Sequence, residues 1–221
     1  YYNRKVKFIG SCDRYPVIFF DKTRYKYEII KESEKIERVF YMNDKIITGN
    51  IKGEVSVYDY KSLKLAYNIA PHKSIINSII KIDDNTFATS SVDKLIKIID
   101  LNTGKIKNEL IGHTDSVKSL VLFEKNILLS AATDRSIRGW DLLKMQTVKI
   151  FEKHTFPIYC MIKINDAQFA TGSWDKTLII WDYNQHRDIA SFTSHSLIYE
   201  LCKINETLLA YGCSDNNIYI L

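Results

Sequence analysis

The chain has 221 residues, of which 46% are hydrophobic and 26% are charged, a composition typical of a soluble globular protein. Lys and Arg outnumber Asp and Glu by 31 to 26, and this net charge of +5 is scattered along the sequence, which argues against a nucleic-acid-binding protein. No apolar stretch reaches the roughly 18–20 residues of a membrane-spanning helix, so we expect no membrane insertion.

The cysteines indicate the compartment. Cys12, Cys160, Cys202 and Cys213 form no CxxC pair, and three of them lie in apolar stretches. This pattern predicts reduced, buried thiols and a reducing compartment, the cytoplasm, with the nucleus as an alternative. The first residues, YYNRKVKF, do not resemble a signal peptide. They lack an initiator Met, so we expect the natural N-terminus to lie upstream, and a removed targeting segment stays open.

The first predicted elements are two short strands around a turn. Residues 10–21, GSCDRYPVIFFD, align with residues 172–182, GSWDKTLIIWD, if one insertion is allowed. The alignment puts Asp13 in the turn and Phe20-Asp21 at the end of the second of these strands. Residues 1–21 are therefore expected to form a partial repeat, and residues 22–31 a further, outer strand.

From residue 22 onward a module of about 41 residues recurs. Two series keep this spacing, His72, His113, His154 and His195, and Asp59, Asp100, Asp141 and Asp182. A second aspartate series, Asp93, Asp134 and Asp175, does the same and then reaches Asp215 one residue early. The series predict complete repeats over residues 22–60, 61–101, 102–142 and 143–183, and a nearly complete repeat over 184–221, within a single domain of residues 1–221.

Each module reads as four short strands. Apolar runs of four to eight residues, such as SVKSLVLF and ILLSAAT, are rich in β-branched or aromatic side chains and are bounded by Asn, Asp, Gly and Ser. Helices of ten or more residues find no room between these turns. Four antiparallel strands in every forty residues, repeated, predict an all-β fold, namely a β-propeller built of four-stranded antiparallel blades.

Several residues of the module resemble the signature of WD-repeat β-propellers. They are the pair Gly112-His113, the Asp in the turn of the middle hairpin, and the Trp-Asp pair that ends the third strand. The resemblance covers nearly the whole chain, with about six repeats visible. We count about 22 strands, fewer than six or seven closed blades require. We therefore expect the chain to be part of a seven-bladed ring, either as a fragment of a longer protein or with its ring completed by a partner.

Two modules carry a His, a hydroxyl, an Asp and a Trp in a pattern that could suggest a catalytic triad. The sets are His113, Ser130, Asp134 and Trp140, and His154, Thr171, Asp175 and Trp181. An enzyme needs one such site, whereas a repeat protein needs one per blade. The resemblance implies a structural chain of hydrogen bonds from indole to hydroxyl to imidazole to carboxylate. We therefore expect no catalytic residue and no enzyme activity. Successive blades spread the histidines around a ring, so we also expect no metal site and no cofactor.

Three other modules depart from this set. The one at the C-terminal end keeps His195 and Asp215 but has Tyr211 at the hydroxyl position and Leu221 at the Trp position. Another has Ile99 in place of the Trp. In the module of residues 22–60, Lys31 is aligned with the His, and Lys52 or Gly53 with the turn Asp. We expect the blade of this module to be held together mainly by packing.

The resemblance also implies where a partner binds, because WD-repeat propellers mostly bind other proteins through one face of the ring. The positions used are the third and fifth residues after each His and the residue before the turn Asp. On this chain, if the one-residue deletion after His195 is allowed for, they include Ser116, Pro157 and Leu197, then Lys118, Tyr159 and Tyr199, and finally Thr133 and Trp174. Aromatic residues beside apolar neighbours are typical of interfaces, so we predict a partner-binding patch centred on Trp174, Tyr159 and Tyr199.

The function predicted from these features is a non-catalytic protein–protein interaction platform, a scaffold or adaptor subunit of a multiprotein complex that binds other proteins or peptide segments. Two alternatives stay open. One is a purely structural subunit whose propeller is completed by a partner strand or blade. The other is a substrate receptor that reads phosphorylated or acidic peptides through Lys118, with Arg135 and Arg138 nearby. We interpret the two arginines as solvated surface.

Overall fold

The structure is a computed structural model that describes residues 6–9, 17–21, 26–30 and 32–221. The turn predicted at Asp13 and the alignment of Lys31 with the His lie outside these residues. Within them all regular elements are strands, and no helix is long and apolar enough to cross a membrane.

The described strands form six antiparallel sheets, four of which have four strands. The first sheet contains β1 (Val6–Ile9), β2 (Val17–Asp21) and β3 (Lys26–Ile30). The four-stranded sheets are β4 (Ile36–Met42), β5 (Lys45–Asn50), β6 (Val55–Asp59) and β7 (Leu65–Ile69); β8 (Ile76–Asp83), β9 (Thr86–Ser91), β10 (Ile96–Asp100) and β11 (Ile106–Leu110); β12 (Val117–Glu124), β13 (Ile127–Ala132), β14 (Ser136–Asp141) and β15 (Gln146–Glu152); and β16 (Ile158–Lys163), β17 (Gln168–Ser173), β18 (Thr177–Asp182) and β19 (Arg187–Thr193). The last sheet contains β20 (Ile198–Lys203), β21 (Leu209–Cys213) and β22 (Ile218–Ile220).

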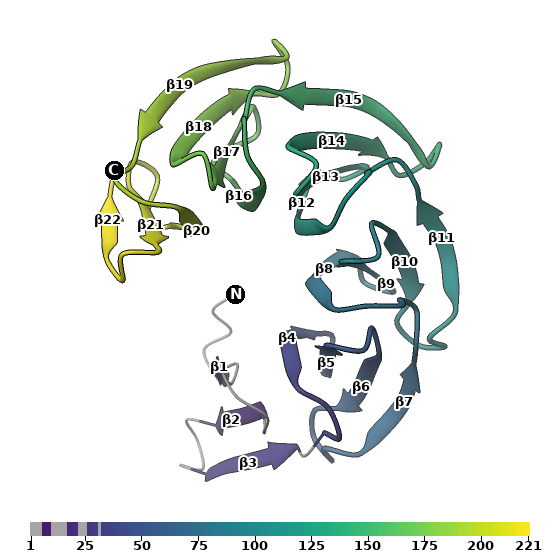
Figure 1. Cartoon of the computed structure of the whole chain (residues 1–221). Coiled ribbons are helices and arrows are strands. Elements are labelled where there is room, and N and C mark those ends of the chain that lie inside the picture. The colour runs from purple at the N-terminus through teal and green to yellow at the C-terminus, as the bar shows by residue number, and fades with distance from the viewer. Residues whose placement is uncertain (1–5, 10–16, 22–25, 31) are drawn as a thin grey trace.

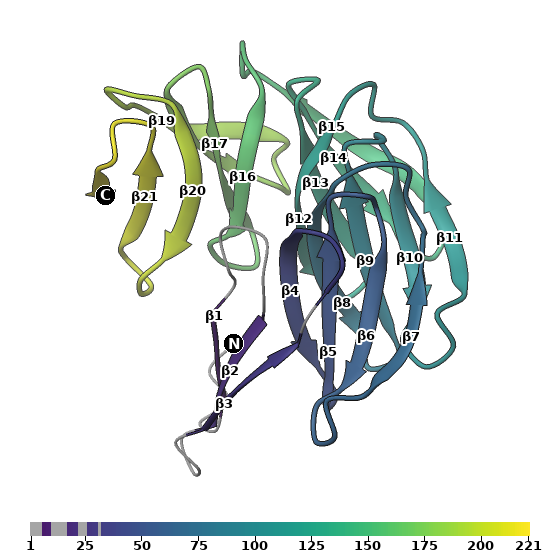
Figure 2. The ribbon, with the colours of Figure 1, turned by 60° about the horizontal axis from the view of Figure 1, so that its bottom comes forward.

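The five sheets from β4 onward stand side by side around a central axis, as the blades of a propeller do (Figure 1). The first strand of each blade (β4, β8, β12, β16 and β20) lies nearest the axis, and the fourth strands (β7, β11, β15 and β19) lie at the rim (Figures 1 and 2). The predicted all-β propeller of four-stranded antiparallel blades is confirmed. The seven-bladed ring stays a prediction.

The modules of the sequence are offset from the blades by one strand. Residues 61–101 contain β7 of one blade and β8–β10 of the next. The chain therefore leaves each blade at the rim and enters the next blade near the axis (Figure 1).

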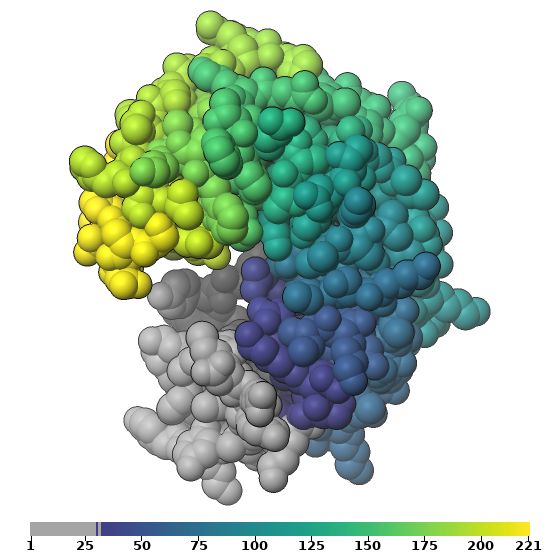
Figure 3. Space-filling model, in the orientation of Figure 1, coloured from purple at the N-terminus to yellow at the C-terminus, as the bar shows by residue number. Residues whose placement is uncertain are grey.

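The apolar core consists of layers between neighbouring blades. One layer combines Phe123, Leu129 and Phe151 of blade β12–β15 with Phe169 and Trp181 of blade β16–β19. Second and third strands are therefore covered on both faces, which explains their continuous apolar runs. The fourth strands lie at the rim and are largely exposed. In the space-filling view the surfaces of consecutive blades from β4–β7 onward meet without a break (Figure 3).

A carboxylate ends the third strand of each four-stranded blade. Asp141 Oδ1 accepts hydrogen bonds from the amides of Leu143 (2.8 Å) and Lys144 (3.1 Å) in the turn that follows. Asp59, Asp100 and Asp182 accept equivalent bonds in their own turns. The Asp of each Trp-Asp position therefore fixes the turn towards the rim strand.

Candidate functional site

The predicted polar set of blade β12–β15 forms one continuous chain of hydrogen bonds. The indole Nε1–H of Trp140 donates to Ser130 Oγ (2.8 Å), which lies 2.7 Å from His113 Nε2. His113 Nδ1 in turn lies 2.8 Å from Asp134 Oδ2. An indole can only donate and an ionised carboxylate can only accept, so Ser130 donates to Nε2 and the Nδ1–H of His113 donates to Asp134. The chain ties the entry of β12 to the hairpin of β13 and β14.

Blade β16–β19 repeats this arrangement. Trp181 donates to Thr171 Oγ1 (2.8 Å), Thr171 lies 2.8 Å from His154, and His154 lies 2.7 Å from Asp175. Both central hydroxyl residues, Ser130 and Thr171, are 0% exposed. A substrate cannot reach either oxygen without opening the blade, although the order of groups matches a catalytic triad.

The carboxylate of Asp134 is the most connected member of its chain. Besides His113 it accepts hydrogen bonds from the amides of Thr114 (2.9 Å) and Ser136 (3.0 Å) and from the Ser136 hydroxyl (2.7 Å). Burial opposes ionisation of this carboxyl, but the hydrogen bond and charge of His113 and the other donors outweigh it and hold its pKa well below the usual range. Asp134 is therefore ionised across the physiological pH range.

Blade β8–β11 keeps three of the four groups. His72 Nε2 lies 2.9 Å from Thr89 Oγ1, and His72 Nδ1 lies 2.9 Å from Asp93 Oδ2. Ile99 stands where the other blades have Trp, so Thr89 receives no indole N–H. Burial lowers the pKa of His72, although Asp93 opposes this shift.

Blade β4–β7 contains a different polar set, which adds hydrogen bonds to the packing that was expected to hold it. Glu32 Oε1 accepts hydrogen bonds from Thr48 Oγ1 (2.8 Å) and from the hydroxyl of Tyr58 (2.6 Å). Thr48 and Tyr58 lie 41 residues before Thr89 and Ile99, so they are the hydroxyl and Trp positions of this blade. Glu32 therefore replaces the His as the acceptor.

The turn of this blade also differs. The sequence leaves open whether Lys52 or Gly53 stands at the turn Asp position. Gly53 has a φ of 86° and corresponds to Lys94 (φ 76°), which follows the turn residue Asp93 in the next blade. Lys52 therefore stands at the turn Asp position. The turn is fixed instead by Asn50, whose Oδ1 accepts from the amides of Lys52 (2.9 Å) and Glu54 (3.0 Å).

Replacing Glu32 by alanine is expected to lower the free energy of unfolding by about 1–3 kcal/mol, because the hydroxyls of Thr48 and Tyr58 lose their acceptor. Chemical denaturation followed by intrinsic fluorescence measures the loss. Lys35→Ala serves as control, since it removes a surface ion pair with Glu37 and is expected to cost less than about 1 kcal/mol. Equal stabilities of the Glu32 variant and the unmodified protein would show that this carboxylate does not replace the His.

Each first strand has a β-bulge at the same place. The pairing of the first with the second strand skips one residue on the first strand. The skipped residues are Glu37, Asn77, Lys118, Tyr159 and Tyr199. A bulge turns a side chain out of the regular alternation, which explains why this position can carry such different residues. Glu37 was not predicted as a face position, because its blade lacks the His from which the positions are counted. Counting five residues from Glu32, which takes the place of the His, does reach Glu37.

The other predicted positions of the face lie beside this bulge. The amide of Trp174 donates to the carbonyl of Pro157 (3.0 Å), and the amide of Thr133 donates to that of Ser116 (2.9 Å). Ser214 and Leu197 make the same bond in the last blade (3.0 Å). We call this end of the propeller, where first strands begin and second strands end, the His-side face.

Three aromatic side chains meet on the His-side face. The rings of Tyr159 and Trp174 are stacked, with centroids 4.4 Å apart and planes 8° from parallel. Tyr199 of the next blade stands edge-on to both, at 5.5 Å from Tyr159 and 5.9 Å from Trp174. We call Tyr159, Trp174 and Tyr199 the aromatic cluster. Tyr199 is 41% exposed, and Tyr159 and Trp174 are half-buried.

Two polar groups lie at the edges of the aromatic cluster. The indole Nε1–H of Trp174 is buried and has no hydrogen-bond acceptor within the described residues. Lys118 comes from the preceding blade, and its ammonium lies 5.2 Å from the centre of the Tyr159 ring. Burial and the nearby Arg38 lower the pKa of Lys118. The cluster therefore combines exposed ring surface, an unused donor and a cation.

The structure corrects two of the predicted residues and adds one. Ser116 is buried, and its hydroxyl accepts a hydrogen bond from Asn77 Nδ2 of the preceding blade (3.1 Å), so it cannot contact a partner. Arg138 is not solvated surface, because its Nε is buried without a partner in the described residues and its guanidinium lies beside Gly112. Phe156, which is 57% exposed next to Pro157, extends the apolar surface and was missed because no family position falls on it.

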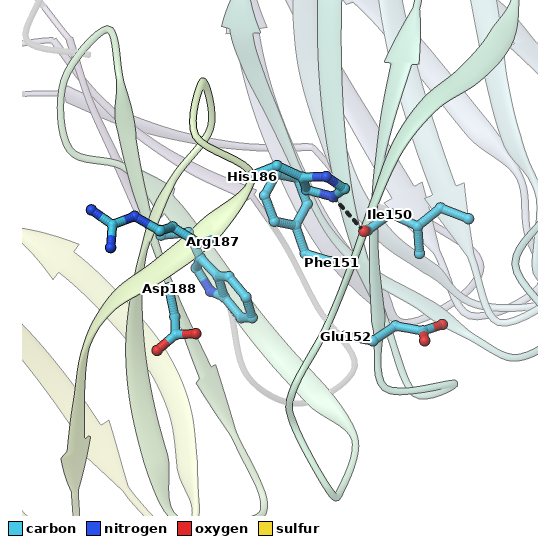
Figure 4. Close-up of a pocket in the computed structure, with 7 residues that line it drawn as sticks. Ile150, Phe151, Glu152, His186, Arg187 and Asp188 are labelled. Atoms are coloured by element: carbon cyan, nitrogen blue, oxygen red, sulfur yellow. Dashed lines mark hydrogen bonds between the residues drawn. The ribbon is translucent and has the colours of Figure 1, made fainter.

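A cavity of about 470 Å³ lies at the rim between blades β12–β15 and β16–β19 (Figure 4). The His186 ring packs edge-on against Phe151, and its Nε2 lies 2.7 Å from the carbonyl oxygen of Ile150. Glu152 and Arg187 extend to opposite sides of this cavity (Figure 4). No Ser, Thr or Cys is among its lining residues, so it offers no hydroxyl or thiol nucleophile. The described residues contain no group of three or more His, Cys, Asp or Glu placed to hold a metal ion.

The family model described as "WD domain, G-beta repeat" matches residues 104–141 and 145–182, the segments that carry the two complete hydrogen-bonded chains. These two segments match WD40 repeats, and together with the fold they support a WD-repeat β-propeller. Propellers of this family are generally non-catalytic and serve as platforms that bind other proteins or peptides. A comparison with curated proteins gave no match.

Solved structures share the fold. The WD40 β-propeller domain of Doa1 superimposes with a TM-score of 0.84 and 19% identity over 98% of this chain and 75% of that chain. The computationally designed Ika8 protein gives a TM-score of 0.83 and 18% identity over 97% of this chain and 66% of that chain. The chain thus spans about three quarters and two thirds of these two proteins. At such identities the likeness concerns the fold alone.

Proposed function

We propose that this protein is a non-catalytic interaction platform, a scaffold or adaptor subunit of a larger assembly, and that it captures a protein partner on the aromatic cluster. The observation that carries the proposal is the contact of Tyr159, Trp174 and Tyr199 across two blades of the His-side face. Aromatic side chains held rigidly by one another lose little conformational entropy on binding, which makes them frequent anchors of interfaces.

The unused donor of Trp174 supports the same proposal. A buried N–H without an acceptor costs free energy in the unbound protein. A carbonyl or carboxylate oxygen of a bound segment would satisfy it once the half-buried indole turns outwards, because the N–H itself is buried in the unbound protein. The indole would then contribute both apolar contact and a hydrogen bond to the complex.

The buried hydroxyls support the non-catalytic part of the proposal. The triad-like groups recur in successive blades, and in each of these blades the hydroxyl is buried beneath the Trp or its replacement. Their role is to stabilise the hairpins. The three free thiols in the described residues, Cys160, Cys202 and Cys213, support the further proposal of a reducing compartment, the cytoplasm or the nucleus.

Replacing Tyr159 and Trp174 together by alanine is expected to abolish partner capture while changing the melting temperature little, because both rings are half-exposed. Affinity capture from cell extract, followed by mass spectrometry, compares this variant with the unmodified protein at equal protein amounts. Leu143→Ala is the matched control, since this residue is 76% exposed on the opposite face. A double variant that still captures the same partners, or one that loses folding together with binding, would contradict the proposed site.

A further inference from the structure

Five cations of the His-side face are without carboxylate partners in the part of the chain that the structure describes, whereas Lys35 and Lys52 of blade β4–β7 pair with Glu37 and Glu34. Lys73 follows a His, Lys94, Arg135 and Lys176 follow the turn Asp of three successive blades, and Lys118 occupies a bulge. Within the described residues none of these five side chains forms an ion pair. Four of them are exposed and Lys118 is half-buried.

Cations on the opposite face are mostly neutralised. Ion pairs join Lys45 to Asp59, Lys61 to Asp44, Lys81 to Asp84, Lys107 to Asp100, Lys144 to Asp141, Lys163 to Asp166 and Lys203 to Glu206. The two faces of the propeller therefore differ in the share of their cations that form ion pairs. On the His-side face of blades β8–β11, β12–β15 and β16–β19 all five of the cations named above are unpaired, whereas the opposite face has these seven ion pairs and three exposed cations without one within the described residues, Lys64, Lys105 and Lys125.

The turn aspartates do not neutralise their neighbours. The side chains of Asp93, Asp134 and Asp175 are only 9%, 6% and 8% exposed, and they face the histidines. The basic residue that follows each of them extends outwards instead. An anion that approaches these three turns therefore meets the cations and not the turn aspartates. The carboxylates of Asp115 and Glu37 lie near Lys118 instead.

The backbone shows that fold stability does not explain these cations. Lys94, Arg135 and Lys176 have φ values of 76°, 71° and 66°, a left-handed conformation that favours glycine or asparagine. The equivalent positions of blades β4–β7 and β20–β22 hold Gly53 (φ 86°) and Asn216 (φ 64°). Three successive blades thus place a long basic side chain where a smaller residue would be less strained. Leu63, Met145 and His186 in the turns of the opposite face also have positive φ values, so the inference rests on the charge of the three residues and not on strain.

We propose that the His-side face binds a peptide segment rich in Asp and Glu, which places an apolar or aromatic residue on the aromatic cluster and its carboxylates on Lys94, Arg135 and Lys176. The inference rests on the proposed function, because it uses the aromatic cluster as the anchor. Lys176 lies two residues from Trp174, and Lys118 contacts Tyr159, so the cationic and aromatic surfaces are continuous. Charge-assisted hydrogen bonds to carboxylates then add to the apolar contact.

The test uses an array of synthetic 14-residue peptides with varied apolar centres, flanked by Glu, by Gln, by phosphoserine or by Lys. Fluorescence anisotropy then measures the affinity of the selected peptides. We expect Glu-flanked peptides to bind, Gln-flanked peptides of the same centre to bind about tenfold more weakly or worse, and binding to weaken about tenfold between 0.05 and 0.5 M NaCl. Binding of no peptide, equal binding of the Glu and Gln sets, or binding of phosphoserine peptides alone would overturn the proposal. So would tighter binding of a single-stranded oligonucleotide at the same face.

Two variants of equal charge locate the site. Lys94→Gly, Arg135→Gly and Lys176→Gly together remove three cations at left-handed positions that glycine adopts freely, so folding should be retained while binding of the Glu-flanked peptides falls about tenfold or more. The control is Lys64→Ser, Lys105→Ser and Lys125→Ser, which removes three exposed cations from the opposite face. Equal binding by the two triple variants would overturn the inference.

The aromatic double variant separates this inference from the proposed function. Loss of binding in that variant but not in the glycine triple variant would leave the aromatic site standing and reject the acidic partner. Loss in the glycine triple variant alone would keep the acidic partner and reject the aromatic anchor.

Discussion

Replacing Asp134 by alanine is expected to lower the free energy of unfolding by about 2–4 kcal/mol, as measured by chemical denaturation. The carboxylate accepts four hydrogen bonds, from His113, the amide of Thr114 and the amide and hydroxyl of Ser136. Alanine leaves these donors without an acceptor inside the hairpin. The loss extends further, because His113 also orients the hydroxyl of Ser130 towards Trp140.

A second aspartate of the same blade is the control for this variant. Asp141 caps a turn through two amides at the surface, so Asp141→Ala is expected to cost about 1 kcal/mol or less. Equal losses in the two variants would show that the chain of side-chain hydrogen bonds adds nothing beyond a turn cap.

The pH dependence gives an independent measurement on the Asp134 variant. The folded protein holds the pKa of Asp134 below its unfolded value of about 3.9, so the folded state binds fewer protons in acid. The contribution of this carboxylate is complete above that value and is lost as the pH falls through the lower, folded pKa. The unmodified protein should therefore lose stability between about pH 5 and pH 2, and the alanine variant should lose less over this window. Parallel curves would contradict the role given to the carboxylate.

Replacing Gly172 by alanine is expected to destabilise the protein by about 1–3 kcal/mol, again by chemical denaturation. A Cβ at this position would lie 2.5 Å from Ile198 Cγ2 and 2.7 Å from Cys160 Sγ, well inside van der Waals contact. Ile198 belongs to the next blade, so the clash pushes two blades apart rather than disturbing a single hairpin.

The repeat supplies a matched control for this substitution. Gly212 is the equivalent glycine of the last blade, and a Cβ there would meet no described atom within 4 Å. Gly212→Ala is therefore expected to be neutral or slightly stabilising, because alanine restricts the unfolded chain. A loss at Gly212 as large as that at Gly172 would point to strand propensity instead of contact between blades.

The parts of the fold that could be predicted from sequence are those that repeat. The His and Asp series place the strands and turns, and the side chains of His113, Ser130, Asp134 and Trp140 all come from one blade. Their contacts are therefore fixed by the spacing within a module. Contacts between blades could not be predicted in this way, because they join residues of different modules, and the spacing within one module does not indicate which of these residues meet.

Two residues illustrate this limit, and a third, Glu32, illustrates a limit of a different kind within one blade. Ser116 occupies a predicted binding position, but Asn77 of the preceding blade covers it. Lys118 reaches the ring of Tyr159 in the next blade, which its own module does not indicate. Glu32 was not predicted from sequence, because the alignment compared only residues at the His position. A carboxylate can nevertheless accept a hydrogen bond from a hydroxyl, as the imidazole of the His does in the other blades.

The position of the apolar layers between blades has a consequence for how such proteins are recognised. Each layer belongs jointly to two neighbours, so a blade that lacks the diagnostic His, Asp or Trp still keeps an interior on both sides. The family model finds two segments of this chain, although its described residues form six sheets. The signature residues can thus be absent from individual blades while the propeller architecture is kept. Counting signature matches therefore underestimates the number of blades.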